Sequence, residues 1–258
     1  MSQWNPDQYE RFASERAAPF FDLLGLVEPI NAPRVVDLGC GTGELTAQAH
    51  QRLGARETTG IDNSPTMLSR AHALRVEGVT FRDGDIATFT GDATFDVVLS
   101  NAALQWVPDH PAVLARWSRA LTDTGQLAVQ LPANSDHPSH RIAVDVASES
   151  PFAEAFGGDP PPDPTSRVLA PEVYAEILEE LGFARQHVRL QVYPHHLASS
   201  ADVVEWVKGT SLTRIESRLA PDLYQHFLDR YRTRLLAHIG DKQPYFYAFK
   251  RILFWGHR

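Results

Sequence analysis

The sequence of 258 residues has little cysteine, little methionine and no long apolar run. Cys40 is the only cysteine, so no disulfide can form within the chain, and a reducing, cytoplasmic setting is expected. No apolar stretch approaches the roughly 20 residues that a membrane-spanning helix needs. The chain opens on the polar stretch MSQWNPDQYERF, which is unlike a secretory signal. These absences predict a soluble globular protein.

Basic residues are also outnumbered, because 24 Lys and Arg face 32 Asp and Glu and give a net charge of −8. This charge argues against a protein that binds nucleic-acid backbones non-specifically. Residues 160–258 nevertheless hold 13 basic against 11 acidic residues, and six of the eleven histidines. A locally cationic pocket there can attract a small anion, although basic residues on helix surfaces explain the count equally well. The histidines lack metal-ligand spacing with acidic or cysteine partners, so no metal is expected.

Short apolar runs alternate with helix-like stretches from residue 34 to residue 131. Strands are expected at 34–38, 57–62, 79–85, 95–101 and 125–131, and helices at 44–53, 65–75 and 111–121. This alternation predicts an α/β fold with a parallel sheet and right-handed crossovers. Before it, Asn5-Pro6 is expected to start a helical segment that Pro19 divides into two helices.

The alternation of strands and helices ends after residue 132, where polar, proline-rich stretches predict a loop or lid. A helix is expected at 171–181, a strand at 184–193, helices at 200–217 and 221–238, and a last strand at 245–256. The predicted organisation is one domain over 1–258. Its parts are an N-terminal helical lid at 1–30, a core at 31–131, a loop or lid at 132–170 and a helical cap at 199–240 over the ligand site.

The stretch VVDLGCGTGELT, residues 35–46, places glycines at every second position directly after a strand. Ligands of open α/β sheets bind beyond the carboxyl ends of the strands, and glycine lets the backbone approach them closely. A dinucleotide-binding turn reads G-x-G-x-x-G. Here the third glycine comes one residue early, and Glu44 stands in its place. Asp37 and Glu44 would repel a pyrophosphate and tolerate a ligand with an amino group and a sulfonium.

Two further acidic residues end the next two expected strands. Asp62 can accept hydrogen bonds from both hydroxyls of a ribose, and Asp85 can accept one from an adenine amino group while Ile86 donates its backbone N–H. Met67 and Ile86 could then enclose the adenine ring. Taken singly, such an Asp is commonly a helix cap and Met67 a core residue. Together, at successive strand ends, they favour a nucleoside ligand.

The motifs DLGCGTG, GIDNSPTML, DGDI and FDVVLSNAALQWV, over about residues 30–131, resemble the motif series of class I S-adenosylmethionine-dependent methyltransferases. The resemblance implies a Rossmann-like seven-stranded sheet, mostly parallel with an antiparallel last strand, and helices on both faces. It also implies S-adenosyl-L-methionine as cofactor and S-adenosyl-L-homocysteine as product. The expected cofactor contacts are Trp4, Tyr9, Arg16, Asp37, Gly39, Gly41, Asp62, Met67, Asp85, Ile86 and Asn101. For the first three, plain helix packing is an equal alternative.

A closer resemblance, to carboxylate-methylating members of that family, runs over nearly the whole chain. WNPDQYERFASERAAPFFDLL, NAALQWVPDH, QLPANSDHPSHR, VYAEILEELG and FKRILF carry it, with the stretch around Tyr193 and His195. It implies methyl transfer to a carboxylate of a small tricarboxylic acid, giving the monomethyl ester. A carboxyl group with a pKa near ~4 is already ionised at neutral pH, so no catalytic base is expected. Positioning and exclusion of water are the protein's expected contributions.

The other carboxylates of such a substrate need cationic partners, and arginine is preferred because its fork pairs two oxygens at once. Arg251 is the best placed by resemblance. The expected substrate contacts are Trp106, Arg167, Tyr174, Tyr193, His195, His196, Arg214 and Arg251. A surface ion pair is the alternative for each cation, and packing on a short helix is the alternative for Trp106.

Other functions stay open from the sequence. A different acid, hydroxyl or amine could be the acceptor, or the chain could bind the cofactor without catalysis. A hydroxyl acceptor normally wants a base near Asn101, and no His or Lys follows until His110. Nucleic-acid amino methyltransferases would show Asn-Pro-Pro-aromatic where Asn101-Ala102-Ala103-Leu104 stands. The glycine spacing disfavours a nicotinamide oxidoreductase. No nucleic-acid or membrane partner is expected, and the oligomeric state is not predicted.

Overall fold

The computed structural model describes residues 13–258, with side chains from residue 17 onward, and they form two compact units. The sheet unit comprises Arg16–Pro132, Val168–Gln191 and Arg251–Arg258. The helical unit comprises Ala133–Arg167 and Val192–Lys250, with the described residues 13–15. Among the described residues, no helix has the length and apolar character needed to cross a bilayer.

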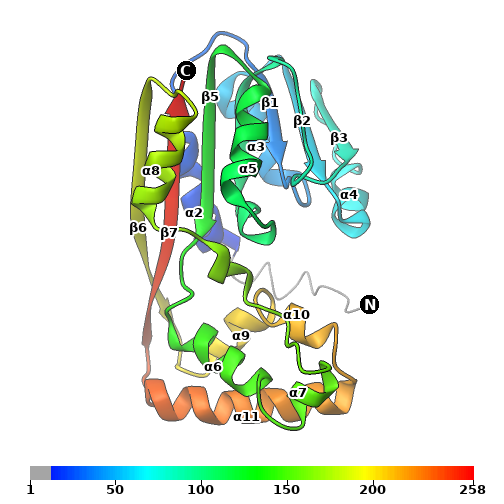
Figure 1. The fold of residues 1–258 in the computed structure, drawn as a ribbon, viewed down its shortest axis with the longest axis vertical. Coiled ribbons are helices and arrows are strands. Elements are labelled where there is room, and N and C mark those ends of the chain that lie inside the picture. Colours follow the sequence, from blue (N-terminus) through cyan, green and yellow to red (C-terminus); the bar gives the residue numbers. More distant parts are fainter. Residues whose placement is uncertain (1–12) are drawn as a thin grey trace. The chain divides into compact units, whose positions relative to one another are not determined.

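A seven-stranded sheet runs in the order β3-β2-β1-β4-β5-β7-β6 (Figure 1). Its strands are β1 (Arg34–Leu38), β2 (Glu57–Asp62), β3 (Val79–Asp83), β4 (Phe95–Asn101), β5 (Leu121–Pro132), β6 (Arg185–Leu197) and β7 (Tyr245–His257). Strands β1 to β5 pair in parallel, and β7 pairs antiparallel with β5. The predicted α/β class with a mostly parallel seven-stranded sheet is confirmed. Its strand order reverses direction beside β1, so the carboxyl ends of β1 and β4 border a switch point where ligands bind.

Helices cover both faces of the sheet. They are α2 (Ala13–Leu24), α3 (Glu44–Leu53), α4 (Pro65–Ala71), the short η1 (Leu104–Trp106), α5 (His110–Arg119) and α8 (Pro171–Glu180). Successive strand residues point to opposite faces. Leu253 accordingly packs in one apolar cluster with Phe20 of α2, whereas Phe254 stacks on Tyr174 of α8 with ring centroids 4.8 Å apart. Burial of both faces is what a mostly parallel sheet requires.

Pro19 lies inside α2, so the prediction that it divides two helices is wrong. A proline removes one backbone hydrogen bond from a helix and crowds the preceding turn. Phe20 and Leu23 directly after it are fully buried, and they pack with Val97 and Leu99 of β4. Burial of two large apolar side chains stabilises by about 3–6 kcal/mol, enough to offset the proline. The helix expected to start at Asn5-Pro6 lies outside the described residues.

The helical unit gathers around its longest helix, α11 (Pro221–Ile239), which Figure 1 shows with α6 and α7 lying along it. The other elements are α6 (Pro138–Ala147), α7 (Phe152–Ala155), η2 (Pro164–Arg167), α9 (Asp202–Lys208) and α10 (Thr213–Glu216). Phe227 and Tyr231 of α11 share an apolar cluster with Trp206 of α9 and Val146 of α6. This unit therefore has its own core.

Two local predictions fail in the helical unit. The helix expected at 200–217 is divided into α9 and α10 by Gly209, which caps the end of α9. The stretch after residue 132, expected to be loop, carries α6. His137 caps this helix, and Pro138 fits its first turn because that position needs no backbone donor. The prolines in this stretch favoured the prediction of a loop, although one of them begins the amphipathic helix.

Candidate functional site

The glycine turn after β1 needs backbone conformations that glycine takes readily. Gly39, Gly41 and Gly43 have φ angles of 85°, 56° and 81°. A Cβ on Gly39 would lie 2.2 Å from the Cβ of Ala103, so packing also requires glycine there. A Cβ on Gly41 would meet no atom within 4 Å. The turn is thus packed on the protein at Gly39 and open at Gly41, where a ligand can approach the backbone.

Asp37, near the end of β1, is a buried carboxylate with an unsatisfied oxygen. It is 3% exposed, and its Oδ2 accepts a 2.6 Å hydrogen bond from Thr46 Oγ1. Its Oδ1 is buried, and no donor among the described residues reaches it. Burial raises the pKa of Asp37 to about 6, opposed by the Thr46 bond and aided by the charge of Asp62. Above that pH the site holds a buried negative charge that a cationic ligand would stabilise.

Asp62, at the end of β2, holds the glycine turn in place. Its Oδ2 accepts a 2.9 Å hydrogen bond from the Gly41 N–H, and its Oδ1 accepts one of 2.9 Å from the Ser64 N–H. Ser64 in turn caps α4 by accepting from the Met67 N–H at 3.4 Å. Each carboxylate oxygen keeps a lone pair for another donor. Asp62 is therefore structural, with capacity left for the predicted ribose contact.

Cys40 lies buried in the same turn. Burial raises the pKa of its thiol far above the ordinary range, and the charges of Asp37 and Asp62 add to the rise. The thiol stays neutral, so Cys40 packs the turn and is a poor nucleophile.

Asp85 and Ile86 follow β3. Asp85 is exposed, and its Oδ1 accepts a 2.8 Å hydrogen bond from the Ala87 N–H. Ile86 is 8% exposed, and its carbonyl accepts a 2.9 Å hydrogen bond from Trp117 Nε1 of α5. This segment is therefore anchored to a helix while the Asp85 carboxylate faces solvent. The adenine contacts of Asp85, Ile86 and Met67 remain predictions.

A row of polar side chains crosses β4, β5 and β7 at the same edge of the sheet. Arg251 Nη1 donates to Gln130 Oε1 at 3.0 Å, and Gln130 Nε2 donates to Asn101 Oδ1 at 2.6 Å. Gln130 and Arg251 are buried, at 1% and 6% exposure, whereas Asn101 is half-buried. The sequence pointed to Asn101 and Arg251 but not to Gln130. The sequence feature that could have indicated Gln130 is its position as a polar residue inside the apolar run of β5.

The chain turns sharply after Asn101. Ala102 has a φ of 54°, which is strained for a residue other than glycine. Gln130 accepts from the Ala102 N–H at 2.8 Å through its backbone carbonyl, and Gln105 Nε2 donates to the Ala102 carbonyl at 2.7 Å. Trp106 follows in η1 and is 49% exposed. The turn thus fixes the backbone beside Asn101 and leaves a large aromatic ring at the surface.

Tyr174 does not lie at a ligand-accessible position, which corrects the prediction that it contacts substrate. It is 0% exposed, its hydroxyl lies 2.7 Å from His110 Nδ1, and it accepts from the Leu169 N–H at 3.2 Å. Its ring stacks on Phe254. The residue packs α8 on the sheet because its apolar ring and its hydroxyl both have protein partners.

The remaining predicted substrate contacts lie in the helical unit. Tyr193 and His195 are 8% exposed, and the His195 ring lies 5.2 Å from that of Trp206. His196 is exposed, with its ring 5.4 Å from that of Phe246. Arg167 ends η2 and is exposed. The structure thus places Tyr193 and His195 in an aromatic cluster, and their contact with substrate stays a prediction.

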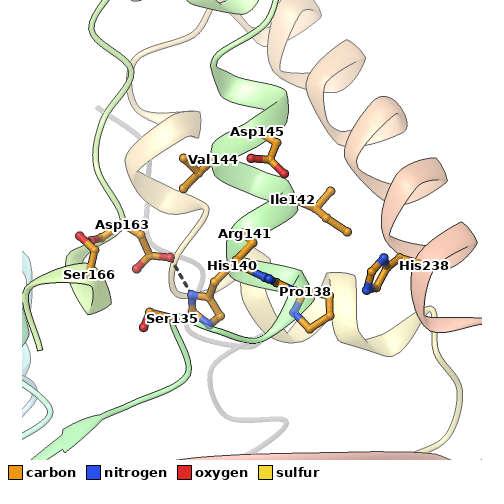
Figure 2. Close-up of a pocket in the computed structure, with 10 residues that line it drawn as sticks. All are labelled: Ser135, Pro138, His140, Arg141, Ile142, Val144, Asp145, Asp163, Ser166 and His238. Atoms are coloured by element: carbon orange, nitrogen blue, oxygen red, sulfur yellow. Dashed lines mark hydrogen bonds and ion pairs between the residues drawn. The ribbon is translucent and has the colours of Figure 1, made fainter. Parts of the chain in front are cut away.

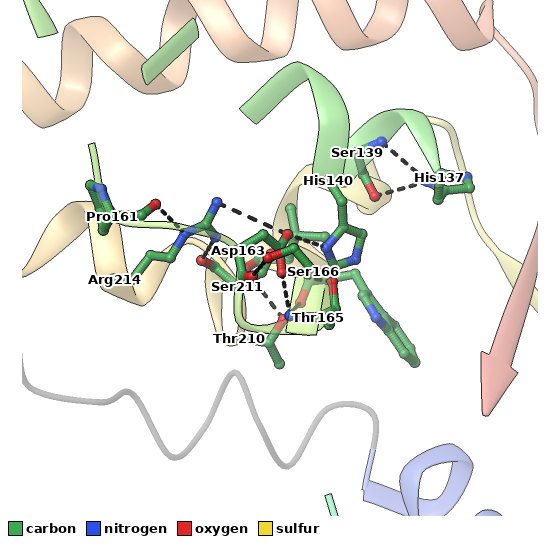
Figure 3. Close-up of polar contacts among 12 residues, drawn as sticks. His137, Ser139, His140, Pro161, Asp163, Thr165, Ser166, Thr210, Ser211 and Arg214 are labelled. Atoms are coloured by element: carbon green, nitrogen blue, oxygen red, sulfur yellow. Dashed lines mark hydrogen bonds and ion pairs between the residues drawn. The ribbon is translucent and has the colours of Figure 1, made fainter. Parts of the chain in front are cut away.

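Arg214 is held by acceptors inside the helical unit (Figure 3). Its Nε donates to the Pro161 carbonyl at 3.1 Å, its Nη1 donates to the Ser211 carbonyl, and its Nη2 lies 4.0 Å from Asp163 Oδ2. Burial lowers the pKa of Arg214. The guanidinium therefore fastens α10 to the loop before η2, which leaves it little freedom to turn toward a substrate.

Asp163 is the centre of this cluster, and nothing in the sequence indicated it. It accepts from His140 Nδ1 at 2.7 Å, and from the backbone N–H and hydroxyl of Thr165 at 2.8 and 2.7 Å. Burial alone would raise the pKa of Asp163, but these donors and the charges of His140 and Arg214 hold it well below its usual range. The proline-rich loop is ordered because one ionised carboxylate ties it to α6 and α10.

A hollow of about 540 Å³ opens beside α6 in the helical unit (Figure 2). It is lined by Ser135, Pro138, His140, Arg141, Ile142, Val144, Asp145, Asp163, Ser166 and His238. None of the predicted site residues lines it. Within the described part of the chain, no group of three or more His, Cys, Asp or Glu is arranged to hold a metal ion. Trp4, Tyr9 and the side chain of Arg16 lie outside the described residues, so the N-terminal lid stays a prediction.

Known proteins resemble this chain in sequence. A family model described as a methyltransferase domain matches residues 31–156. Trans-aconitate 2-methyltransferase of Deinococcus radiodurans is 43% identical over 259 residues, which cover 97% of this chain and 96% of the relative. The enzyme of the same name from Mycobacterium sp. strain KMS is 38% identical over 255 residues, covering 96% of this chain and 97% of the relative.

Solved structures resemble the fold. The YcgJ protein of Bacillus subtilis aligns with a TM-score of 0.64 at 15% identity, covering 93% of this chain and 97% of that one. Phosphoethanolamine N-methyltransferase 2 of Haemonchus contortus, solved with S-adenosyl-L-methionine, aligns with a TM-score of 0.54 at 17% identity, covering 95% of this chain and 52% of that one. At these identities the likeness concerns the fold alone.

Proposed function

Because the chain belongs to the trans-aconitate 2-methyltransferase family, which depends on S-adenosylmethionine, we propose that it methylates one carboxylate of trans-aconitate to the monomethyl ester. The substrate is then a small tricarboxylate anion, and S-adenosyl-L-homocysteine is the second product. A cytoplasmic location is part of the proposal, supported by a single cysteine that forms no internal disulfide.

The observation that carries the proposal is the order of charges along the sheet edge. Asp62 of β2 and Asp37 of β1 supply negative charge, Asn101 and Gln130 of the next two strands supply neutral amides, and Arg251 of β7 supplies a cation. A cationic methyl donor is favoured at the acidic side and an anionic acceptor at the basic side. A reaction between a sulfonium and a carboxylate needs this polarity.

The residues present fit the cofactor. The unsatisfied Asp37 Oδ1 can accept from an amino group, and the open face of Gly41 admits a ligand against the backbone. Asp62, Met67, Asp85 and Ile86 would hold the nucleoside part, as predicted above. When bound, S-adenosylmethionine supplies a methyl group on a positively charged sulfur.

The chain's own contribution is to orient and to exclude water. The substrate carboxylate is ionised at neutral pH, so no residue has to remove a proton. Arg251 would orient the acid, and Trp106 would shield it. Charge disappears as the ester forms, so a site with little water favours the reaction. Orientation of the two reactants can contribute on the order of 7–11 kcal/mol.

The test is a methyl-transfer assay on a panel of di- and tricarboxylates, with the ester detected by mass spectrometry. We expect trans-aconitate to react far faster than its relatives. Arg251→Lys keeps the charge but loses the fork and should lower kcat/KM about 10-fold or more, whereas Arg251→Ala should lower it further. If the cofactor binds and no acid is methylated, the proposed substrate is wrong.

A further inference from the structure

The hydrogen bonds between Arg251, Gln130 and Asn101 determine which way two amide groups point. A guanidinium can only donate, so the Gln130 atom that faces Arg251 must be the oxygen. The Gln130 NH₂ group then faces Asn101 and must donate, so the Asn101 atom that faces Gln130 must also be its oxygen. This assignment follows from the chemistry of arginine alone.

This assignment determines which group Asn101 presents at the accessible end of the row of polar side chains. Gln130 and Arg251 are buried, whereas Asn101 is half-buried at the carboxyl end of β4. With its oxygen engaged by Gln130, Asn101 turns its NH₂ group away from β5. No acceptor among the described residues takes this group. A donor with two N–H bonds is therefore presented at the sheet edge beside the glycine turn.

We propose that Gln130 is a positioning residue that makes Asn101 a dedicated donor to a carboxylate of the bound reactants. An amide free to rotate could present either atom, but this one cannot present its oxygen without breaking its bond to Gln130. The inference rests on the proposed methyl transfer, which offers two such carboxylates. One belongs to the amino-acid end of the cofactor, and the other belongs to the acid substrate.

The substitution Gln130→Glu replaces the donor that faces Asn101 by an acceptor, while the side chain keeps its shape. The introduced carboxylate can accept from Arg251 but cannot donate to Asn101, so the Asn101 amide should turn, donate to that carboxylate and present its own oxygen to the ligand. The new ion pair with Arg251 should preserve the fold, which circular dichroism and thermal melting would verify. Replacing a charge-assisted hydrogen bond by a repulsive contact should weaken carboxylate binding roughly 10- to 100-fold.

Two titrations by calorimetry distinguish the sources of the carboxylate. Weaker binding of S-adenosylhomocysteine assigns Asn101 to the cofactor. Weaker binding of trans-aconitate to the enzyme–S-adenosylhomocysteine complex, with unchanged cofactor affinity, assigns it to the acid. Unchanged affinity in both titrations overturns the inference. Neither titration needs turnover, so failure of the wild-type enzyme to methylate any acid would defeat the proposed function separately.

Matched variants exclude a merely structural effect. Gln126 lies on the same strand, is 1% exposed, and accepts from Trp255 Nε1 at 2.7 Å. Gln126→Glu makes the same chemical change four residues earlier on the strand and should leave both affinities unchanged in the folded protein. In an Asn101→Ala background, Gln130→Glu should lower affinity much less than it does in the wild-type background, because no amide remains to turn and only the new ion pair with Arg251 acts. A loss of affinity of the same size in both backgrounds would contradict the proposal.

The wild-type protein offers a test that does not depend on the folding of a variant. Side-chain amide resonances of Asn101 and Gln130 can be assigned in ¹⁵N-labelled protein by substitution. Addition of S-adenosylhomocysteine, and then of trans-aconitate, should shift the Asn101 NH₂ signals in one of the two steps. The same signals unmoved in both steps would overturn the inference.

Discussion

At the scale of single residues, Asp37 holds a negative charge where burial disfavours it. Its folded-state pKa of about 6 lies above the ordinary value, so the folded protein binds a proton more readily than the unfolded chain. The stability associated with this group is complete below about pH 4 and is lost as the pH rises toward 6. At neutral pH the free protein is therefore less stable because of the carboxylate, and a cationic ligand relieves the cost.

Asp37→Asn should separate stability from binding. An amide keeps the bond from Thr46 and removes the buried charge, so the cofactor-free variant should be about 1–2 kcal/mol more stable than wild type at pH 8. Its affinity for S-adenosylmethionine should fall at least 10-fold. Urea unfolding at pH 8 and at pH 4, with calorimetric binding, provides the measurement. A stability gain of equal size at both pH values would show that charge is not the cause.

At the scale of elements, the glycine turn contains two glycines with different reasons for being there. Gly39→Ala adds a Cβ only 2.2 Å from Ala103 at a positive φ, so it should destabilise the protein by about 2–4 kcal/mol. Gly41→Ala adds a Cβ in open space, so only the φ penalty of about 1–2 kcal/mol applies.

Among folded molecules, ligand affinity should be lowered more by Gly41→Ala than by Gly39→Ala, which is the reverse of their effects on stability. The Gly41→Ala protein should fold and bind S-adenosylhomocysteine at least 10-fold more weakly, because the new methyl group occupies the open face of the turn. Thermal melting and calorimetry would measure the two effects. Unchanged affinity in Gly41→Ala would show that the ligand does not approach the backbone at this position.

Helix α6 begins at a titratable cap. His137 Nδ1 accepts from the Ser139 N–H at 3.2 Å, which only an unprotonated nitrogen can do. Burial lowers the pKa of His137 to about 4, and the nearby His140 charge lowers it further while Asp136 opposes the shift. The unfolded chain binds the proton more readily, so stability is complete above about pH 6.5 and falls as the pH drops toward 4.

His137→Asn keeps a cap acceptor that does not titrate. Wild type and variant should have similar stability at pH 7, and the variant should be more stable by about 1 kcal/mol at pH 4.5, since the half-buried ring is partly screened by solvent. Urea unfolding at the two pH values would measure the difference. His137→Ala should lose the cap at both values and serves as the control. Parallel pH dependence in wild type and His137→Asn would assign the titration to another group.

At the scale of the whole molecule, a net charge of −8 opposes the approach of a tricarboxylate and favours that of a cationic cofactor. Screening lengths are about 30 Å at 0.01 M and about 8 Å at 0.15 M ionic strength. Raising the salt across this range should therefore increase kcat/KM for the acid a few-fold and weaken cofactor binding. A dicarboxylate should show a smaller increase. A fall of kcat/KM for trans-aconitate would mean that local basic residues dominate the field.

The sequence alone determined the fold class and located the acidic residues of the proposed site. Alternating apolar and helical segments are local patterns, so strands such as 34–38, 57–62 and 95–101 were predicted at their observed bounds. Asp37, Gly39 and Asp62 were also found locally, because each directly follows or ends an apolar run. Parallel strands bring these ends to one edge of the sheet whatever the details of packing.

The tertiary structure decided what depends on partners distant in sequence. Gln130 acquires its role from Arg251, which is 121 residues away, and Asp163 acquires its role from His140 and Arg214. Tyr174 has a ring and a hydroxyl that could bind a ligand. Only its packing against Phe254 in the tertiary structure showed that it is buried. Pro19 does not end its helix, because burial of the neighbouring side chains outweighs the free-energy cost of a proline inside a helix. Burial and hydrogen bonding between remote segments are collective, so no local pattern of residues reports them.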